Sequence, residues 1–361
     1  MQKKVNFTVV LCAAFSLLYI FFAVRPLSRE IHFLTRWTVD SNKSSPETDS
    51  SQPDSSALIP FKLGQTAGYF TQDGRIASVF TFPYKIALSR DNYCIYGTSD
   101  KTMNVYSAKG EKLSEITSSG FPYFQDDRKF LMLPGGNSFA CLSEDSKIKW
   151  TYENYVPLTA FDSSAQGIAA GYADGSILVF DGEGTVQQNF FPGGSEYPVI
   201  LGLAVSDDAN MTASISGLNS QRFILAEKES GHTKITYHEY LEAQTTEQCL
   251  VKFSRDSSHV YFAHKNCLGV ADCRKLTAKH IKIPGKILSI CESETDSTIF
   301  VLSSENLDSG LRKYHVSILQ NFNICSDSFS FTAQNAFITV KGNSLFTGRD
   351  SSISRIDVTY R

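Results

Sequence analysis

The chain has 361 residues, with 34 Lys and Arg against 37 Asp and Glu and a formal net charge of −3 at pH 7. Proteins that bind nucleic acid concentrate basic charge to neutralise phosphates, so this balance argues against a nucleic-acid partner. Eight cysteines without a Cys-x-x-Cys spacing argue against a small disulfide scaffold, a zinc ribbon and a c-type haem site.

The first element in chain order is an almost wholly apolar stretch over residues 5–24. A helix of that length spans about 30 Å, the thickness of the hydrocarbon layer of a bilayer. The stretch therefore predicts a transmembrane signal anchor in the lipid bilayer, after a short tail over residues 1–4. A cleaved signal peptide is one alternative, but the exit of the stretch lacks a small-x-small cleavage site. A lipoprotein modified at Cys12 is another, although Leu11 stands where a small residue is expected.

The charges that flank this stretch bear on its orientation. Lysines at positions 3 and 4 precede it and arginines at 25, 29 and 36 follow it, so the positive-inside count does not decide. A short basic leader before a lone anchor favours placing the C-terminal part outside the cytoplasm, in the periplasm. The opposite orientation, with a cytosolic propeller acting as an adaptor, is the alternative.

Two segments connect the apolar stretch to the rest of the chain. Residues 25–37 are predicted to be a juxtamembrane segment, with Trp37 at the membrane interface. Residues 38–57 are rich in serine and acidic residues and contain no large apolar residue after Val39. Such a segment cannot bury enough apolar surface to offset its ordering entropy, so it is predicted to be a disordered linker.

From residue 58 to 361 the sequence repeats short alternating strands and polar turns. Gly97–Ser107 and Gly171–Asp181 are two similar copies, 74 residues apart. Strand ends followed by a polar turn extend this register to seven units: Gly97, Gly135, Gly171, Gly217, Ala263, Ser303 and Gly348. A period near 40 residues with four strands per unit is typical of a β-propeller blade. The predicted fold is therefore an all-β, seven-bladed propeller of four-stranded blades.

Three segments resemble the WD40-like and quinoprotein-like (PQQ-like) propeller families of bacteria. Gly97–Leu113 and Gly171–Val186 look like the turn and the last two strands of a WD40 repeat. Phe253–Ala263 is similar to the Ser-x-Asp turn and strand of periplasmic translocation-type propellers. The Trp-Asp signature is absent, because Tyr106-Ser107 and Phe180-Asp181 stand in its place. The resemblance covers about residues 65–361 and implies a propeller, which here follows the predicted N-terminal membrane anchor.

The ring must also close. The last unit ends at Arg361 without a fourth strand, while residues 75–80 form a spare strand after an Asp73-Gly74 turn. Because an open ring would expose sheet edges, we expect residues 75–80 to complete the last blade. The alternative is that the hairpin over residues 69–80 is a blade of its own, which would give eight blades.

The sequence offers no catalytic, cofactor or metal site. It lacks the Gly-x-Ser-x-Gly and His-Glu-x-x-His motifs. The closest histidine spacings, His232 with His238 and His259 with His264, are single pairs without further ligands. Cys267 and Cys273 are predicted to flank a hairpin, where they would pair only in an oxidising compartment. Asp-Gly steps such as Asp174-Gly175 are interpreted as hairpin turns and not as calcium ligands.

These observations predict a non-enzymatic scaffold that binds protein partners through loops of the ring. By resemblance, the propeller lipoprotein of the outer-membrane protein assembly machinery is one example of such a role. A quinoprotein-like enzyme or a small-molecule sensor is the alternative, although quinoproteins need many docking tryptophans and this chain has 2. The predicted contact residues lie in the loops of the longer units: Gly217, Asn219, Gln221, Lys228, His232, Glu305 and Asp308.

Overall fold

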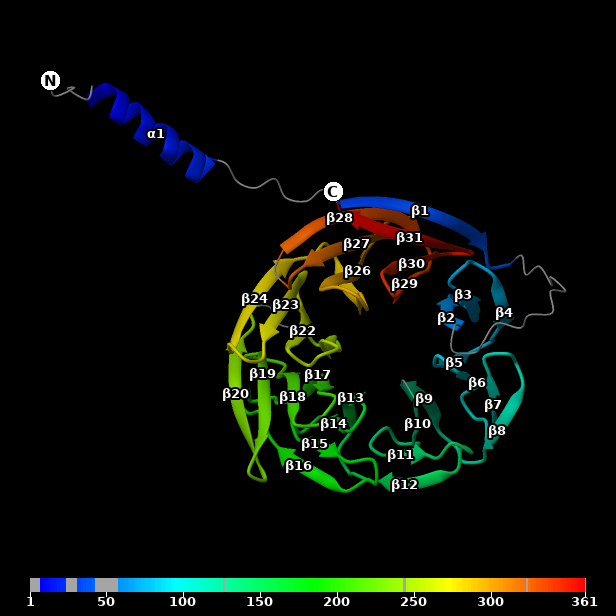
Figure 1. Cartoon of the computed structure of the whole chain (residues 1–361). Coiled ribbons are helices and arrows are strands. Elements are labelled where there is room, and N and C mark those ends of the chain that lie inside the picture. The colour runs from blue at the N-terminus through cyan, green and yellow to red at the C-terminus, as the bar shows by residue number, and fades with distance from the viewer. Residues whose placement is uncertain are drawn as a thin grey trace.

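The computed structural model describes a ring of eight β-sheets preceded by one helix (Figure 1). The described residues are 7–23, 31–42, 58–125, 127–242, 245–308, 310–322 and 324–360. The predictions for residues 1–4 and for most of the linker, residues 43–57, lie outside them. Within the described residues the sheets number eight, so the prediction of seven blades is wrong and the alternative count is confirmed.

The first four blades follow one another along the chain. The first is three-stranded, β2 (Leu58–Leu63), β3 (Thr66–Thr71) and β4 (Ile76–Thr81), and each later blade has four strands. The second blade comprises β5 (Lys85–Leu88), β6 (Asn92–Tyr96), β7 (Met103–Ser107) and β8 (Lys112–Ile116). The third comprises β9 (Phe121–Gln125), β10 (Arg128–Met132), β11 (Phe139–Leu142) and β12 (Ile148–Tyr152). The fourth comprises β13 (Leu158–Ser163), β14 (Ile168–Tyr172), β15 (Ile177–Phe180) and β16 (Val186–Phe190).

The last four blades complete the ring. The fifth comprises β17 (Ile200–Val205), β18 (Met211–Ser216), β19 (Arg222–Glu229) and β20 (His232–Tyr240). The sixth comprises β21 (Val251–Phe253), β22 (His259–His264), β23 (Cys267–Asp272) and β24 (Thr277–Lys282). The seventh comprises β25 (Lys286–Glu292), β26 (Thr298–Asn306), β27 (Arg312–Gln320) and β28 (Ile324–Ala333). The eighth comprises β29 (Ala336–Lys341), β30 (Ser344–Arg349), β31 (Ser352–Tyr360) and β1 (Ile31–Asp40).

An N-terminal strand does close the ring, but it is β1 and not residues 75–80. β1 pairs antiparallel with β31 from Ile31 opposite Tyr360 to Asp40 opposite Ser352 (Figure 1). Residues 76–81 instead form the outermost strand of the first blade. The propeller therefore includes residues 31–40, which were assigned to the juxtamembrane segment and the linker.

Trp37 shows why the N-terminal strand belongs to the ring. Its indole packs edge-on against Phe70 of the first blade, at 6.3 Å between ring centroids, and lies 5.9 Å from Phe346 of the eighth. Its Nε1 donates a hydrogen bond to the carbonyl of Gln72 (3.3 Å). Trp37 thus fills the junction between the first and last blades, and its predicted role at a membrane interface is wrong.

The helix α1 (Phe7–Ala23) occupies the predicted apolar stretch. It has 17 residues, and positions 5, 6 and 24 of the predicted span lie outside the described residues. Among the residues that the structure describes, none of the helices combines the length and the apolar character needed to cross a membrane.

The cores of the propeller lie between neighbouring blades. In the second to seventh blades the first strand is innermost; β5 contacts β9, β13 and β21 contact β17, and β25 contacts β29 around the axis of the ring, which we call the channel (Figure 1). Apolar residues of the middle strands are almost fully buried; in β15, for example, all four side chains are buried. Each alternating strand therefore buries one face against the preceding blade and the other against the following blade.

The first blade lacks the innermost strand that the others have. Its first turn, at Gly64, lies against Asn335 in the connection between the seventh and eighth blades. Phe82, which follows β4, donates its backbone N–H to the carbonyl of Gln65 at the same face of the ring (3.1 Å). β2 therefore runs in the direction of the second strands of the other blades. Gly64 occupies the position that Gly97 and its six counterparts occupy in the later units.

Asp357 joins the closing strand to its blade. Its carboxylate accepts hydrogen bonds from Arg36 Nε (2.7 Å), Arg355 Nε (2.9 Å) and Ser344 Oγ (3.0 Å). Arg36 stands at a bulge in β1, where the register shifts between Thr35 and Trp37. Burial alone would raise the pKa of Asp357, but these three donors outweigh it and hold the pKa below its usual value.

This contact predicts an acid-sensitive closure. A carboxyl whose pKa is lower in the folded state stabilises the fold above its unfolded pKa, and the stabilisation is lost as the pH falls through the folded pKa. We expect Asp357→Asn to lower the free energy of unfolding by about 1 kcal/mol at neutral pH, allowing for solvent screening, and to have less effect below about pH 4. Urea unfolding across pH measures this, with the exposed Asp127→Asn as the control. An equal loss at all pH values would contradict the assignment.

Candidate functional site

The connections between strands divide into two faces of the ring, because antiparallel strands alternate in direction. We use the name crossover face for the face that carries two kinds of connection. These are the connections between successive blades and the connections between the second and third strands of a blade. Its connections between blades are residues 82–84, 117–120, 153–157, 191–199, 241–250, 283–285 and 334–335. The opposite face carries the turns between first and second strands and between third and fourth strands.

Exposed aromatic side chains gather on the crossover face. Six of them lie in its connections or at the strand ends beside these: Tyr84 (63% exposed), Phe121 (45%), Tyr155 (102%), Phe191 (59%), Tyr197 (60%) and Tyr240 (58%). A seventh, Tyr123, stands on an innermost strand in the channel. Beyond α1, the described residues place no exposed aromatic side chain in the turns of the opposite face. Large exposed apolar groups confined to one face indicate a contact surface.

A cavity of about 410 Å³ opens in the channel wall beneath these loops. Innermost strands of the third to sixth blades supply most of its wall, with apolar side chains that include Tyr123, Leu158, Phe161, Leu201 and Leu203. Gln248 crosses it, and its Nε2 donates to the carbonyl of Thr159 (2.8 Å). The cavity therefore combines apolar side chains with polar groups, among them Asp162 and Gln248, as ligand-binding cavities commonly do.

Three of the predicted contact residues support the crossover face from within. Gln221 is buried, and its Nε2 donates to the carbonyls of Gly217 (3.0 Å) and Thr245 (3.1 Å). Asn219 accepts a hydrogen bond from Ser195 Oγ through its side-chain oxygen (2.5 Å). These residues hold the loops over 191–199 and 241–250 in place, and little of their surface is accessible to a partner.

The other four predicted residues divide between the two faces. Glu305 and Asp308 are exposed on the crossover face of the seventh blade. Lys228 and His232 flank the turn between β19 and β20, on the opposite face. The structure therefore does not bring the seven residues together. Longer units proved a poor guide, because their extra residues extend strands on both faces.

The aromatic residues were missed, although the sequence contains a signal for them. An aromatic residue directly precedes proline in four places, Phe82-Pro83, Phe121-Pro122, Phe191-Pro192 and Tyr197-Pro198. Proline lacks a backbone N–H and is placed at strand ends. These aromatic-proline pairs thus lie in or beside three of the connections between blades.

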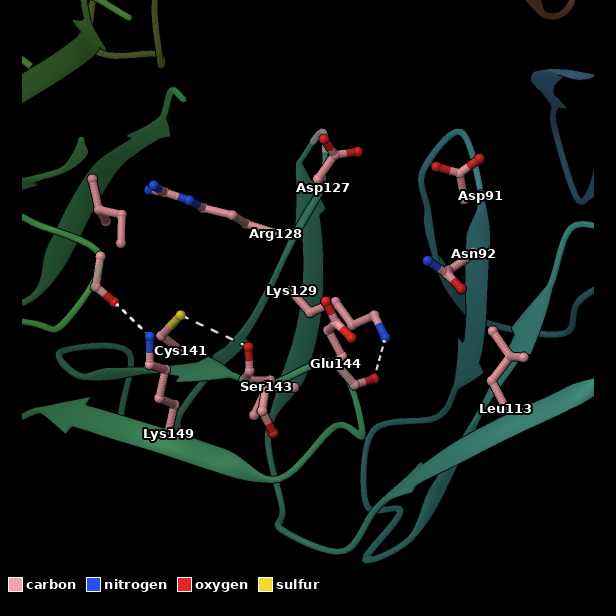
Figure 2. Close-up of a pocket in the computed structure, with 13 residues that line it drawn as sticks. Asp91, Asn92, Leu113, Asp127, Arg128, Lys129, Cys141, Ser143, Glu144 and Lys149 are labelled. Atoms are coloured by element: carbon pink, nitrogen blue, oxygen red, sulfur yellow. Dashed lines mark hydrogen bonds between the residues drawn. The ribbon is translucent and has the colours of Figure 1, made fainter. Parts of the chain in front are cut away.

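The opposite face contains a larger cavity, of about 680 Å³, between the second and third blades (Figure 2). Its cations are bound to backbone carbonyls. Arg128 donates to Gly167 (3.0 Å) and Ala165 (2.8 Å), and Lys129 Nζ donates to Glu144 (2.9 Å). Burial lowers the pKa of Lys129. These groups hold neighbouring turns together, so we do not assign the cavity a ligand.

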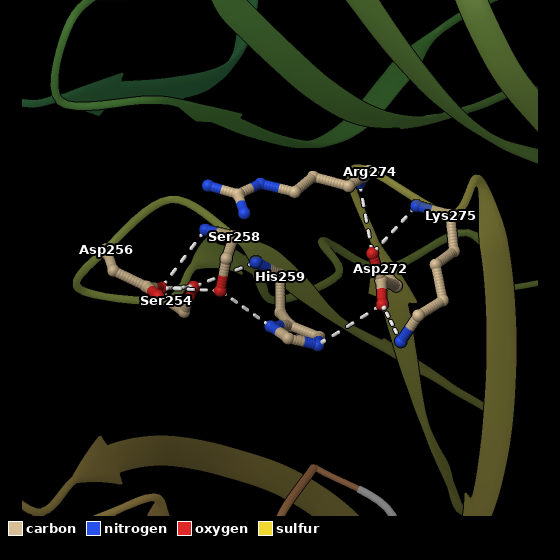
Figure 3. Close-up of polar contacts among 7 residues, drawn as sticks. All are labelled: Ser254, Asp256, Ser258, His259, Asp272, Arg274 and Lys275. Atoms are coloured by element: carbon tan, nitrogen blue, oxygen red, sulfur yellow. Dashed lines mark hydrogen bonds and ion pairs between the residues drawn. The ribbon is translucent and has the colours of Figure 1, made fainter.

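The Ser-x-Asp element of the sixth blade forms a turn held by side chains (Figure 3). Asp256 accepts hydrogen bonds from Ser254 Oγ (2.7 Å) and Ser258 Oγ (2.7 Å). Ser258 also bonds His259 Nδ1 (2.8 Å), whose Nε2 lies 3.9 Å from Asp272. The series of contacts from Ser258 to His259 to Asp272 resembles a hydrolase triad. The Ser258 hydroxyl, however, donates its hydrogen bond to Asp256 within the turn. Ser206 and Asp208 form a similar turn in the fifth blade (2.7 Å).

Histidines and cysteines lie differently from the predicted pairs. His264 contacts His280 (Nε2 to Nδ1, 2.8 Å) and not His259, and burial together with His280 lowers the pKa of His264 to about 4. Within the described ranges no three His, Cys, Asp or Glu residues are placed to hold a metal. Cys267 begins β23 and Cys273 follows its end, so about 20 Å of strand separates them and the alternative of a disulfide between them is excluded.

The Asp174-Gly175 step forms the hairpin turn that the sequence predicts. Gly175 has a φ of +88°, in the left-handed region that favours glycine. Asp174 Oδ1 accepts hydrogen bonds from the backbone N–H (2.9 Å) and the Oγ (2.7 Å) of Ser176. Its carboxylate therefore stabilises the turn that follows it.

Comparison with known proteins agrees with this architecture. A sequence model of a β-propeller protein family matches residues 1–360. The chain belongs to this family. It is 28% identical over 366 residues to an uncharacterized protein of Treponema pallidum (strain Nichols), covering 99% of this chain and 95% of that protein. The solved structure of BamB from Moraxella catarrhalis is similar with a TM-score of 0.56 and 14% identity, covering 90% of this chain and 98% of BamB. That likeness shows the fold.

Proposed function

We propose that this propeller is a non-enzymatic scaffold that binds protein partners through its crossover face. The observation that carries the proposal is the confinement of exposed aromatic side chains to that face and the channel. Tyrosine and other large side chains contribute most of the binding energy at protein interfaces. Four of them, Tyr155, Phe191, Tyr197 and Tyr240, lie on three successive connections of the ring.

The rigidity of the ring supports the same role. Blade cores on both sides hold each connection at its ends, and Ser195, Asn219 and Gln221 fix the loops from below. A preorganised surface pays less ordering entropy when a partner binds. The fold likeness to BamB is consistent with a propeller that acts as a scaffold, and it identifies no partner for this chain.

We also propose that the propeller lies outside the cytoplasm. The support is the sequence of the N-terminus, where lysines at positions 3 and 4 precede the apolar stretch. A C-terminal fusion to an enzyme that is active only outside the cytoplasm is expected to be active. An inactive fusion, with activity from a matched cytoplasmic reporter, would contradict this placement.

The test of the scaffold is a pair of matched variants. Tyr155→Ser with Tyr197→Ser removes two exposed aromatic side chains from the crossover face, whereas Leu113→Ser with Ile148→Ser removes two exposed apolar side chains from outer strands. We expect the first variant to recover its specific partners at about a tenth of the wild-type amount in quantitative affinity capture. The control is expected to recover them fully, and both variants to keep the wild-type unfolding midpoint.

Two outcomes would contradict the proposal. One is equal recovery by wild type and by the aromatic variant. The other is purification of the protein with a bound small molecule and without a specific protein partner, which would favour the enzyme or sensor alternative.

A further inference from the structure

The crossover loops of the third, fourth and fifth blades have an unusual charge composition. Among the described residues these are 133–138, 153–157, 173–176, 191–199, 217–221, 241–242 and 245–250. They contain five carboxylates, Glu153, Asp174, Glu196, Glu242 and Glu247, and no Lys, Arg or His. Of these, only Glu247 forms an ion pair in the described part of the chain, with Lys286. We call these six loops the acidic sector.

The opposite face of the ring is organised in another way. There some turn carboxylates have cations beside them, such as Asp145 with Lys147 (2.8 Å) and Glu183 with Lys149 (2.7 Å), whereas others, such as Asp181 and Asp256, accept hydrogen bonds within their own turns. The negative charge of the acidic sector is thus a local property and does not follow from the net charge of −3. An unneutralised patch of one sign attracts a partner surface of the other sign.

The aromatic side chains occupy the same loops as the free carboxylates. Tyr155 lies two residues after Glu153, and Tyr197 is adjacent to Glu196. Aromatic faces and carboxylates together attract Lys and Arg, through cation-π contacts and charge. One such contact lies at the edge of the sector, where the Arg222 guanidinium lies 5.7 Å from the ring centre of Tyr240 and donates a hydrogen bond to the carbonyl of Pro192 (3.4 Å).

The cavity in the channel wall, with its apolar side chains, lies below this sector. Leu158 follows directly on the loop 153–157, and Leu250 ends the loop 241–250; both line the cavity. Its volume of about 410 Å³ accommodates one or two large apolar side chains. A partner segment that fits the carboxylates, the aromatic side chains and the cavity needs basic residues to contact the carboxylates and an apolar residue to contact the apolar side chains of the cavity.

We propose that the acidic sector binds a basic, amphipathic segment of a partner protein, with an apolar side chain in the channel cavity and Lys or Arg against the carboxylates. This inference rests on the proposed function and specifies the chemistry of the partner. Removing the negative charge of these carboxylates is expected to weaken binding, because the partner's cations contact several carboxylates at once. Two of these carboxylates lie beside aromatic rings.

The experiment uses the full chain and three labelled peptides of equal length. One alternates Lys and Leu, one alternates Glu and Leu, and one alternates Lys and Ser. We expect fluorescence anisotropy to show that the Lys-Leu peptide binds most tightly and that its affinity falls with added salt. Glu153→Gln, Glu196→Gln and Glu242→Gln together are expected to raise its Kd about tenfold.

The control variant makes the same charge change on the opposite face, Asp145→Asn, Asp181→Asn and Glu183→Gln, and is expected to keep the wild-type Kd. The proposal is overturned if the Glu-Leu or Lys-Ser peptide binds as tightly as the Lys-Leu peptide, or if the control loses affinity equally. If the aromatic variant loses its partners while the carboxylate variant retains them, the basic segment is wrong and the scaffold stands. If neither variant changes partner recovery, the scaffold itself is wrong.

Discussion

A chain that begins at residue 43, and therefore lacks β1, is expected not to form a stable ring. β1 supplies the fourth strand of the eighth blade and packs Phe33, Trp37 and Val39 into two inter-blade cores. Losing this packing costs on the order of 5 kcal/mol, which is comparable to the whole stability of many domains. It also exposes β31 as an unpaired edge that promotes aggregation. Circular dichroism and size-exclusion chromatography of the purified chain measure the outcome.

Two comparisons make the result specific to β1. A chain that begins at residue 25 keeps β1 and is expected to unfold at the wild-type midpoint. In the full-length protein, Trp37→Ala is expected to cost about 3 kcal/mol, whereas Leu34→Ala, on the same strand and 45% exposed, is expected to cost far less. A stable, monomeric chain without β1 would show that the ring closes in another way.

Replacement of Gly269 by alanine is expected to cost about 3 kcal/mol or more. Gly269 lies directly opposite Phe262 in the pairing of β22 with β23. An added Cβ would stand 2.1 Å from the Phe262 ring, which itself stacks on Phe223 of the neighbouring blade at 3.9 Å. The methyl group would therefore push one aromatic ring into another across the junction of the fifth and sixth blades.

The matched control for this substitution is Gly182→Ala, because a Cβ at Gly182 meets no atom within 4 Å. We expect urea unfolding to show little change for the control and a clear loss for Gly269→Ala. The same phenylalanine-glycine pairing joins Phe337 to Gly348 in the eighth blade. If Gly269→Ala is as stable as wild type, the close ring packing between these blades is not as described.

The repeat of strand ends was enough to predict a propeller but not its blade count. All seven registered positions, from Gly97 to Gly348, lie at or near the end of a second strand. The eighth counterpart, Gly64, follows β2 in a blade that lacks its innermost strand, so it is not preceded by a complete unit. A count of complete four-stranded units therefore omits the first blade and assigns its outermost strand to the closure of the ring.

Closure itself followed from physical reasoning, whereas the identity of the closing strand did not. Residues 31–40 alternate apolar and polar side chains, but they lie next to an apolar stretch that was interpreted as a membrane anchor. Local pattern cannot show that Trp37 meets Phe70 and Phe346, which are far away in the sequence. Only the pairing of β1 with β31 decides it.

The sequence predicts that the candidate site is a protein-binding surface made of loops, but it does not predict which loops form that surface. A scaffold with loops as its contact surface was expected, yet Lys228 and His232 lie on the face away from the exposed aromatic residues. Strand direction assigns each loop to a face, so loop length alone gave no such assignment. Combining strand direction with the aromatic-proline pairs would have pointed to Tyr197 and Phe191.

The most direct test of the central claim is site-specific photo-crosslinking on the intact protein in cells. A photoreactive residue at Tyr155 is expected to form a specific crosslink to a partner protein, and one at Ile148, at the start of the same blade's outer strand, is expected to form none. Specific crosslinks at Ile148 with none at Tyr155 would contradict the assignment of the crossover face as the contact surface.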